Sequence, residues 1–122
     1  MRKEKLKDII EIKSKPGQWP YFYVVTDKNI YEFTGQTFVK SDVLPLGQSI
    51  PIIKEYVGQM IVEVKGDGES TIISLENGDK VSFELTHDPF GSEIESWPIV
   101  RLYTKKEAEQ WINEYKEMDT LF

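Results

Sequence analysis

His87 is the only histidine in the chain, and its side chain is the one best suited to proton transfer near neutral pH. It is followed by Asp88, Glu93 and Glu95, so an imidazole lies close in sequence to three carboxylates. Such a group could hold a metal ion, or the anions could raise the pKa of the imidazole and make it a general base. One hypothesis for the function is therefore a metal-assisted hydrolase or a small-ligand-binding domain.

The same stretch has a purely structural interpretation. Asp88-Pro89-Phe90-Gly91 is typical of a turn, because aspartate accepts hydrogen bonds from the backbone while proline and glycine favour turn geometry. One histidine with acids at this spacing matches no known metal-ligand pattern. The pattern favours the turn, and the catalytic hypothesis stays as the alternative.

Gly66-Asp67-Gly68-Glu69-Ser70 invites comparison with a phosphate-binding loop. The third glycine of the G-x-G-x-x-G pattern is replaced by Thr71, and no Walker lysine follows. The stretch also lacks the alternating oxygen ligands and the distal glutamate of a calcium loop. Without any cysteine, the chain has no thiolate for a metal site, a redox pair or a nucleophile. We therefore expect a simple loop here and no cofactor or metal.

The distribution of charge is the strongest functional signal. The chain has a net charge of −6, yet residues 1–20 carry six Lys or Arg against three acids. By contrast, nine acids and two lysines lie between Glu63 and Glu95. An acidic body repels phosphate backbones, so it indicates a basic protein as partner rather than nucleic acid. The alternative is that the acids only keep the protein soluble.

We therefore predict a non-enzymatic, acidic protein-binding module that docks a basic partner. The predicted binding acids are Asp67, Glu69, Glu76, Asp79, Glu84, Asp88, Glu93 and Glu95. Trp97 is the predicted anchor, because tryptophan is enriched at the centres of protein interfaces and Pro98 holds it in an extended segment. Partial burial of Trp97 over a sheet edge is the alternative.

The clearest structural pattern covers residues 60–86. Met60–Val64 and Thr71–Leu75 are predicted strands, and residues 80–86 alternate between polar and apolar as a half-buried strand does. Asn77-Gly78 predicts a tight hairpin turn with positive φ at both central residues. A further strand at residues 99–103 would extend this antiparallel meander.

An amphipathic helix is predicted to follow the meander. Thr104-Lys-Lys-Glu107 has the sequence of a capping box, in which the threonine hydroxyl and the glutamate carboxylate satisfy each other's backbone amides. Five residues recur at spacings of three and four and should pack on the sheet: Ala108, Trp111, Ile112, Tyr115 and Met118. In the alternative, Trp111 and Tyr115 form an exposed ridge for a partner.

The N-terminal half is less regular. Leu6, Ile9 and Ile10 fall at helical spacing and predict a short helix, although Ile10 and Ile12 also alternate as in a strand. Residues 21–26 and 30–34 predict a hairpin, and residues 37–39 a third strand. Two prolines and a glycine make residues 41–51 an irregular connection.

The elements together predict a single α+β domain over residues 1–122, in which an antiparallel meander is packed by the C-terminal amphipathic helix. The length and the apolar content suffice for one independent core. No apolar run approaches the roughly 20 residues that span a bilayer, and the N-terminal residues lack the apolar stretch of a secretory signal. We expect a soluble, cytoplasmic protein.

Residues 57–93 resemble small uncharacterised bacterial and phage domains in three segments: Val57-Gly58-Gln59-Met60-Ile61, Ile72 to Asp79 with its Asn-Gly turn, and Val81-Ser82-Phe83 with His87-Asp88. In size and acidity the whole chain is similar to immunity proteins that neutralise bacterial toxins. The resemblance implies a basic toxin as the partner. It carries no functional residue over to this chain.

Overall fold

The computed structural model describes residues 3–12, 21–33, 38–44, 46–50, 54–67, 70–87 and 96–121. Within these ranges the chain forms ten strands and two short helices. The strands are β1 (Glu4–Ile12), β2 (Tyr21–Thr26), β3 (Ile30–Phe33), β4 (Phe38–Ser41), β5 (Gln48–Ser49), β6 (Met60–Gly66), β7 (Ser70–Leu75), β8 (Lys80–His87), β9 (Ser96–Tyr103) and β10 (Asp119–Thr120). The helices are α1 (Lys105–Glu109) and α2 (Ile112–Glu117).

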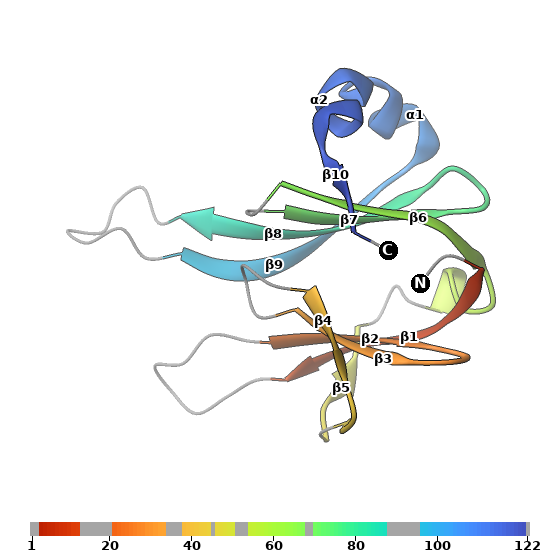
Figure 1. Ribbon diagram of the computed structural model, residues 1–122, viewed down its shortest axis with the longest axis vertical. Helices are drawn as coiled ribbons and strands as arrows, with labels where there is room; N and C mark the ends of the chain where they lie inside the picture. Colours follow the sequence, from red (N-terminus) through yellow and green to blue (C-terminus); the bar gives the residue numbers. More distant parts are fainter. Residues whose placement is uncertain are drawn as a thin grey trace.

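All strands belong to one antiparallel sheet that folds over on itself. The strand order is β4-β3-β2-β1-β6-β7-β8-β9, with β5 paired to β1 and β10 paired to β6. Figure 1 shows two layers, one of β6 to β9 and one of β1 to β5. Strand β1 joins them, because Glu4 and Lys5 pair with β6 whereas Leu6 to Ile12 pair with β2.

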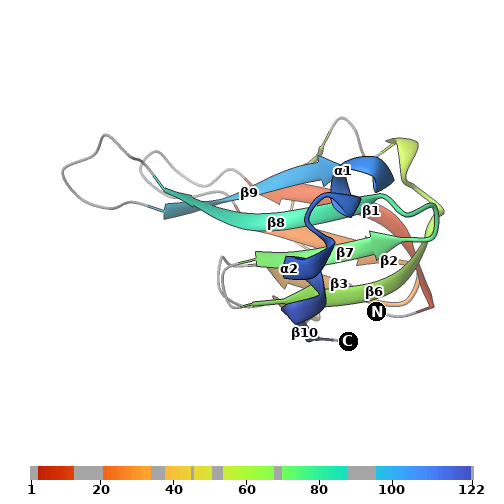
Figure 2. The ribbon, with the colours of Figure 1, turned by 90° about the horizontal axis from the view of Figure 1, so that it is seen from above.

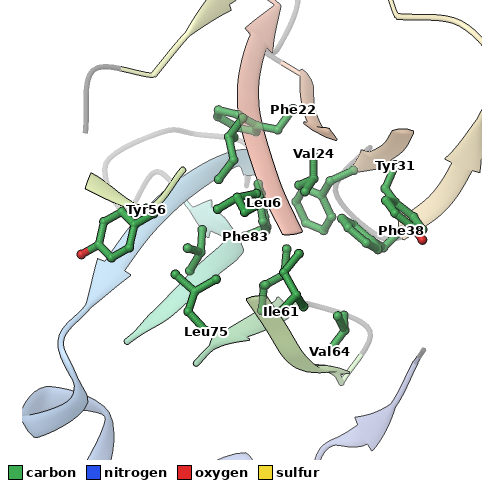
Figure 3. Close-up of a cluster of buried hydrophobic side chains, with 14 of the residues drawn as sticks. Leu6, Phe22, Val24, Tyr31, Phe38, Tyr56, Ile61, Val64, Leu75 and Phe83 are labelled. Carbon is green, nitrogen blue, oxygen red and sulfur yellow. The ribbon is translucent and has the colours of Figure 1, made fainter. Parts of the chain in front are cut away.

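The hydrophobic core lies between the two layers. Both layers turn apolar side chains inward, and Figure 3 shows the cluster that these side chains form. Phe83 of β8 is at its centre, with ring centroids 6.0 Å from Phe22, 5.4 Å from Phe33 and 6.1 Å from Phe38. Fully burying one such side chain contributes about 1.5–3 kcal/mol. The core therefore holds the inner face of β8 in place and leaves its outer face for other contacts.

The predicted α+β class is wrong. The described residues form a sheet-dominated fold, in which the two α-helices have only five and six residues. Figures 1 and 2 show them on the outer side of the β6–β9 layer, away from the core between the layers. Packing of a long amphipathic helix is therefore not what completes this fold.

The predicted N-terminal helix is strand β1. Its register shifts between Leu6 and Asp8, which marks a β-bulge opposite Thr26 and Val25. A bulge adds one residue to a strand, so side chains three apart can face the same side. Leu6 and Ile9 are both fully buried for this reason, and their spacing imitates that of a helix.

The predicted C-terminal helix is interrupted at Trp111. Its start is confirmed: the Thr104 hydroxyl accepts from the Glu107 amide, and the Glu107 carboxylate accepts from the Thr104 amide. Trp111 then leaves the helical conformation, with φ −124° and ψ 28°. Of the predicted apolar stripe, Ala108 and Tyr115 are buried, whereas Trp111, Ile112 and Met118 are half-buried.

The meander and the first hairpin are confirmed. β6, β7, β8 and β9 pair in sequence order, and β2 pairs with β3. The turn after β7 differs from the prediction in one respect, because φ is positive at Gly78 (+92°) and not at Asn77. The Gly78 amide donates to the Leu75 carbonyl at 3.0 Å, as in a type I turn followed by a left-handed glycine.

Among the residues described, no helix has the length and apolar character needed to cross a membrane.

Candidate functional site

A groove lies between the outer face of the β6–β9 layer and helix α2 with its two flanking residues. It has a volume of about 330 Å³. The sheet contributes Ser70, Ile72, Glu84 and Tyr103, and the helical segment contributes Trp111, Glu114 and Met118. The volume lies at the lower end of the range of about 300–1,000 Å³ for small-ligand sites, so the groove suits one side chain or a similar group.

Strand register brings the sheet residues of the groove together. Inward Val81 and Phe83 of β8 alternate with outward Ser82 and Glu84, as the period of two in a strand requires. Ser70 of β7 is the cross-strand partner of Glu84. The groove is thus built on the outer face of the same strands whose inner face forms the core.

The break between α1 and α2 positions the aromatic wall. Trp111 occupies the break, and its ring meets the ring of Tyr103 edge to face at a centroid distance of 5.4 Å. Its other neighbour is Tyr115, at 6.0 Å. Aromatic pairs in this geometry attract each other beyond the area they bury. Contact with Tyr103 therefore accounts for the position of Trp111, which the continuous helical pattern does not.

Glu84 is the sheet carboxylate in the groove, and its two oxygens have different partners. Oε1 accepts hydrogen bonds from the Ser82 hydroxyl at 2.9 Å and the Tyr103 hydroxyl at 3.1 Å. Oε2 pairs with Nε of Arg101 at 3.1 Å. Burial, and then the nearby charge of Glu84, raise the pKa of Tyr103, so this hydroxyl stays protonated as a donor. Oε1 is therefore held by two neutral hydroxyl groups, and Oε2 by the charged side chain of Arg101.

Glu114 is the second carboxylate of the groove. It belongs to α2, and its side chain is exposed. Within the described part of the chain, it has no ion-pair partner closer than 4.0 Å. The groove therefore has one carboxylate on each side, one from the sheet and one from the helix.

A buried polar chain anchors α2 beside the groove. Lys80 donates to the Ser74 hydroxyl at 2.7 Å, Ser74 and Tyr115 share a hydrogen bond of 2.7 Å, and the Tyr115 hydroxyl donates to Glu63 at 2.8 Å. The Lys80 ammonium also lies 3.8 Å from the Tyr115 ring centroid. Burial lowers the pKa of Lys80 and raises that of Tyr115 to about 12.

Serine beside lysine is the pairing of a nucleophile and its base. Here, however, Ser74 is buried under Tyr115, with 5% of its surface exposed. The raised pKa of Tyr115 also keeps its hydroxyl protonated at neutral pH, so this group acts as a hydrogen-bond donor and not as a base. The polar chain therefore acts as the attachment of α2 to the sheet.

A buried carboxylate, Glu4, lies at the start of β1, where this strand pairs with β6. It accepts hydrogen bonds from the Thr26 hydroxyl at 2.6 Å, the Asn29 amide at 2.8 Å and the Tyr31 hydroxyl at 2.8 Å. Burial alone would raise the pKa of Glu4, but its hydrogen bonds, including those from Thr26, Asn29 and Tyr31, outweigh burial and lower the pKa to about 2. Glu4 is 4% exposed and so is closed to ligands.

The structure separates the described members of the predicted acidic surface. Asp67 lies in the loop before β7 and accepts from the Ser70 amide at 2.8 Å. Glu76 and Asp79 lie in the turn after β7, at the opposite end of that strand, where Asp79 accepts from the Lys105 amide at 2.8 Å. Of these predicted acids, Glu84 is the one that lines the groove.

The remaining predicted residues cannot be placed in the groove. Glu69, Asp88, Glu93 and Glu95 lie outside the described residues. The backbone of Trp97, in β9, pairs with Thr86. His87 ends β8 opposite Ser96. Because Asp88 and Glu93 are not described, the predicted site of His87 with these acids stays a prediction. Elsewhere in the described ranges, no group of three or more His, Asp or Glu could hold a metal ion.

Sequence reasoning missed most of the groove. Tyr103, Glu114 and Ile72 were not singled out, and Trp111 and Met118 were assigned to core packing. The available signal was the polar, outward series of residues 80, 82 and 84, which faces the helix that follows the meander. That pattern indicates a polar surface beneath the helix, where an apolar stripe cannot pack fully.

No protein-family model matches the chain, and neither the curated proteins nor the solved structures include a significant match. The resemblance to immunity-type proteins therefore stays a prediction, and the geometry of the groove carries the functional argument.

Proposed function

We propose that this protein is a non-enzymatic binding module that takes a basic segment of a partner protein into the groove between the β6–β9 layer and α2. One observation carries the proposal: carboxylates Glu84 and Glu114 flank a wall made of Tyr103 and Trp111. Cations are attracted to aromatic faces and form charge-assisted hydrogen bonds with carboxylates. The combination is complementary to a basic side chain with a long aliphatic stem.

The charge of the whole chain supports a basic partner. A net charge of −6 attracts cations over several ångströms and speeds their encounter with the protein. Tryptophan and tyrosine are also the residues enriched at the energetic centres of protein interfaces. The net charge of the chain and the residues of the groove thus favour the same class of partner, a basic protein.

The groove accommodates one side chain, so stable binding needs further contacts. The acids Asp88, Glu93 and Glu95, together with Trp97, remain the proposed extension of the interface, since the strands that carry the groove lead to that segment. Such neighbouring charges would add speed and selectivity more than affinity.

An immunity-type role would make the partner a basic toxin domain. The proposal includes a cytoplasmic location, because a cysteine-free chain gains nothing from an oxidising compartment. Growth protection on co-production with a basic toxin tests this finer proposal, and loss of protection in a groove variant would tie the effect to the site.

Fluorescence anisotropy with labelled peptides tests the proposal directly. The probes are a cationic peptide of alternating basic residues and glycine, and an acidic peptide of equal length. We expect salt-sensitive binding of the cationic peptide alone. Trp111→Leu and Glu114→Gln should each weaken it about tenfold, the effect of losing one interface contact of about 1.4 kcal/mol.

Glu76→Gln is the matched control, because it removes one exposed negative charge from a turn outside the groove. It should change the affinity less than about twofold, as expected for a distant, screened charge. Absence of binding at low salt, or equal weakening by Glu76→Gln and Glu114→Gln, would overturn the proposal.

A further inference from the structure

We propose that the groove selects arginine over lysine, and that Arg101 occupies Glu84 in the free protein as a stand-in for the arginine of the partner. This inference rests on the proposed function and names the side chain that the groove takes. On binding, the guanidinium of the partner displaces Arg101 from Oε2 of Glu84.

The orientation of Glu84 supports a guanidinium ligand. Ser82 and Tyr103 hold Oε1, and both belong to the same sheet as Glu84. The carboxylate is therefore fixed in direction, while Oε2 receives Nε of Arg101. A guanidinium presents several N–H donors in one rigid plane, whereas an ammonium is a single compact charge. The internal contact shows that this position accepts a guanidinium nitrogen.

The contact made by Arg101 is easily exchanged. The Arg101 side chain is 57% exposed and the Glu84 side chain 26%. Arg101 belongs to β9, the last strand in the sheet order, and its Nε lies 3.1 Å from Oε2 of Glu84. Exposed ion pairs of this kind contribute little, because water and salt screen them. Releasing Arg101 into solvent therefore opposes binding only weakly.

An arginine from the partner would gain more contacts than Arg101 makes. A guanidinium entering the groove meets Glu84, and its plane can stack on the rings of Tyr103 or Trp111. Glu114 on the helical side can pair with the same group. Lysine could use the charges but would lose the planar stacking and the paired hydrogen bonds, and this difference is the source of the proposed selectivity.

Two labelled peptides that differ only in having arginine or lysine at every basic position provide the test. The unmodified protein should bind the arginine peptide about tenfold more tightly, the size of one charge-assisted contact. Arg101→Ala should tighten binding of the arginine peptide by about threefold, since it removes a weak internal competitor. Glu84→Gln should reduce the preference for arginine to about twofold or less.

Lys40→Ala is the matched control for Arg101→Ala. It removes one exposed cation from β4, in the other layer, and so changes the net charge equally. Circular dichroism checks that each variant is folded. Equal tightening by Lys40→Ala and Arg101→Ala would assign the effect to net charge and overturn the stand-in role, as would weaker binding by Arg101→Ala.

The two proposals fail in different ways. Equal affinity of the unmodified protein for both peptides would overturn the selectivity for arginine and leave the binding of basic segments intact. Failure to bind either peptide at low salt would overturn the proposed function, and this inference with it.

Discussion

Glu4 and Glu84 are both carboxylates on strands, and each accepts hydrogen bonds from a hydroxyl side chain and from a tyrosine. The third donor distinguishes them. For Glu4 it is Asn29, in the turn between β2 and β3, whereas for Glu84 it is the exposed Arg101. The carboxylate of Glu4 thus connects parts of the structure, whereas that of Glu84 is a candidate binding group for a cation.

Location explains this difference. Glu4 lies where β1 passes from one layer to the other, and its donors come from β2, β3 and the turn between them. Glu84 lies on an outer face, and its exposed partner Arg101 comes from an edge strand. A carboxylate surrounded by donors of the packed interior is closed, and one completed by a solvated cation can exchange that cation for a ligand.

The largest expected effect separates the two carboxylates by stability. Glu4→Ala should lower the free energy of unfolding by about 4 kcal/mol, because it leaves three donors, two of them buried, without their charged acceptor. Glu84→Ala should lower it by about 1–2 kcal/mol, since it leaves one buried donor, the Ser82 hydroxyl, without its acceptor, whereas Tyr103 and Arg101 can reach water. Urea denaturation of both variants gives the comparison, and similar losses would show that Glu4 has no special structural role.

Acid pH should remove the stabilisation that the hydrogen bonds of ionised Glu4 provide. Because the folded-state pKa of Glu4 is about 2 and its ordinary value is 4.5, its contribution is fully present above pH 4.5 and is lost as the pH falls toward 2. This contribution is on the order of 3 kcal/mol. Glu4→Gln should therefore flatten the fall in unfolding free energy between pH 4.5 and 2. A slope as steep as that of the unmodified protein would assign the acid sensitivity to other groups.

The tyrosine donors offer a milder version of the comparison. Tyr31→Phe removes a buried donor from Glu4 and should cost about 2 kcal/mol. Tyr103→Phe removes the corresponding donor from Glu84, where Ser82 and water remain, and should cost about 0.5 kcal/mol. Thermal or urea unfolding measures both, and the reverse order of the two losses would contradict the assignment.

The smallest expected effect concerns Arg101. Arg101→Ala should change the unfolding free energy by less than about 0.5 kcal/mol, because an exposed pair contributes little. A loss of about 3 kcal/mol or more, the range of a buried pair, would mean that Arg101 is part of the structure and cannot serve as an exchangeable stand-in.

Local patterns predicted the elements whose formation depends on nearby residues. The alternation after residue 80 and the Thr104 capping box were enough for strand β8 and the start of α1. The N-terminal helix was wrong because a bulge after Leu6 shifts the phase of alternation, and its position depends on pairing with β2. The helix break at Trp111 likewise depends on contact with Tyr103.

Most of the groove could not be predicted from the sequence, because it also depends on contacts between distant residues. Its lining spans residues 70 to 118, and strand register together with the helix break decides which of them meet. Charge counting identified Glu84, but it treated Asp67 and Asp79 as equivalent to it. The structure gives those two aspartates local roles, in the loop before β7 and at the start of α1. Counting charges cannot distinguish a carboxylate that lines a groove from one that caps a backbone amide.

Amide and indole chemical shifts during titration with the arginine peptide test the central claim most directly. We predict that the signals that move belong to the groove, including the Trp111 indole and the amides of Glu84, Tyr103 and Glu114. The amides of Thr26 to Tyr31, around Glu4, should stay in place. Shifts confined to other surfaces, or equal shifts around Glu4 and Glu84, would contradict the account.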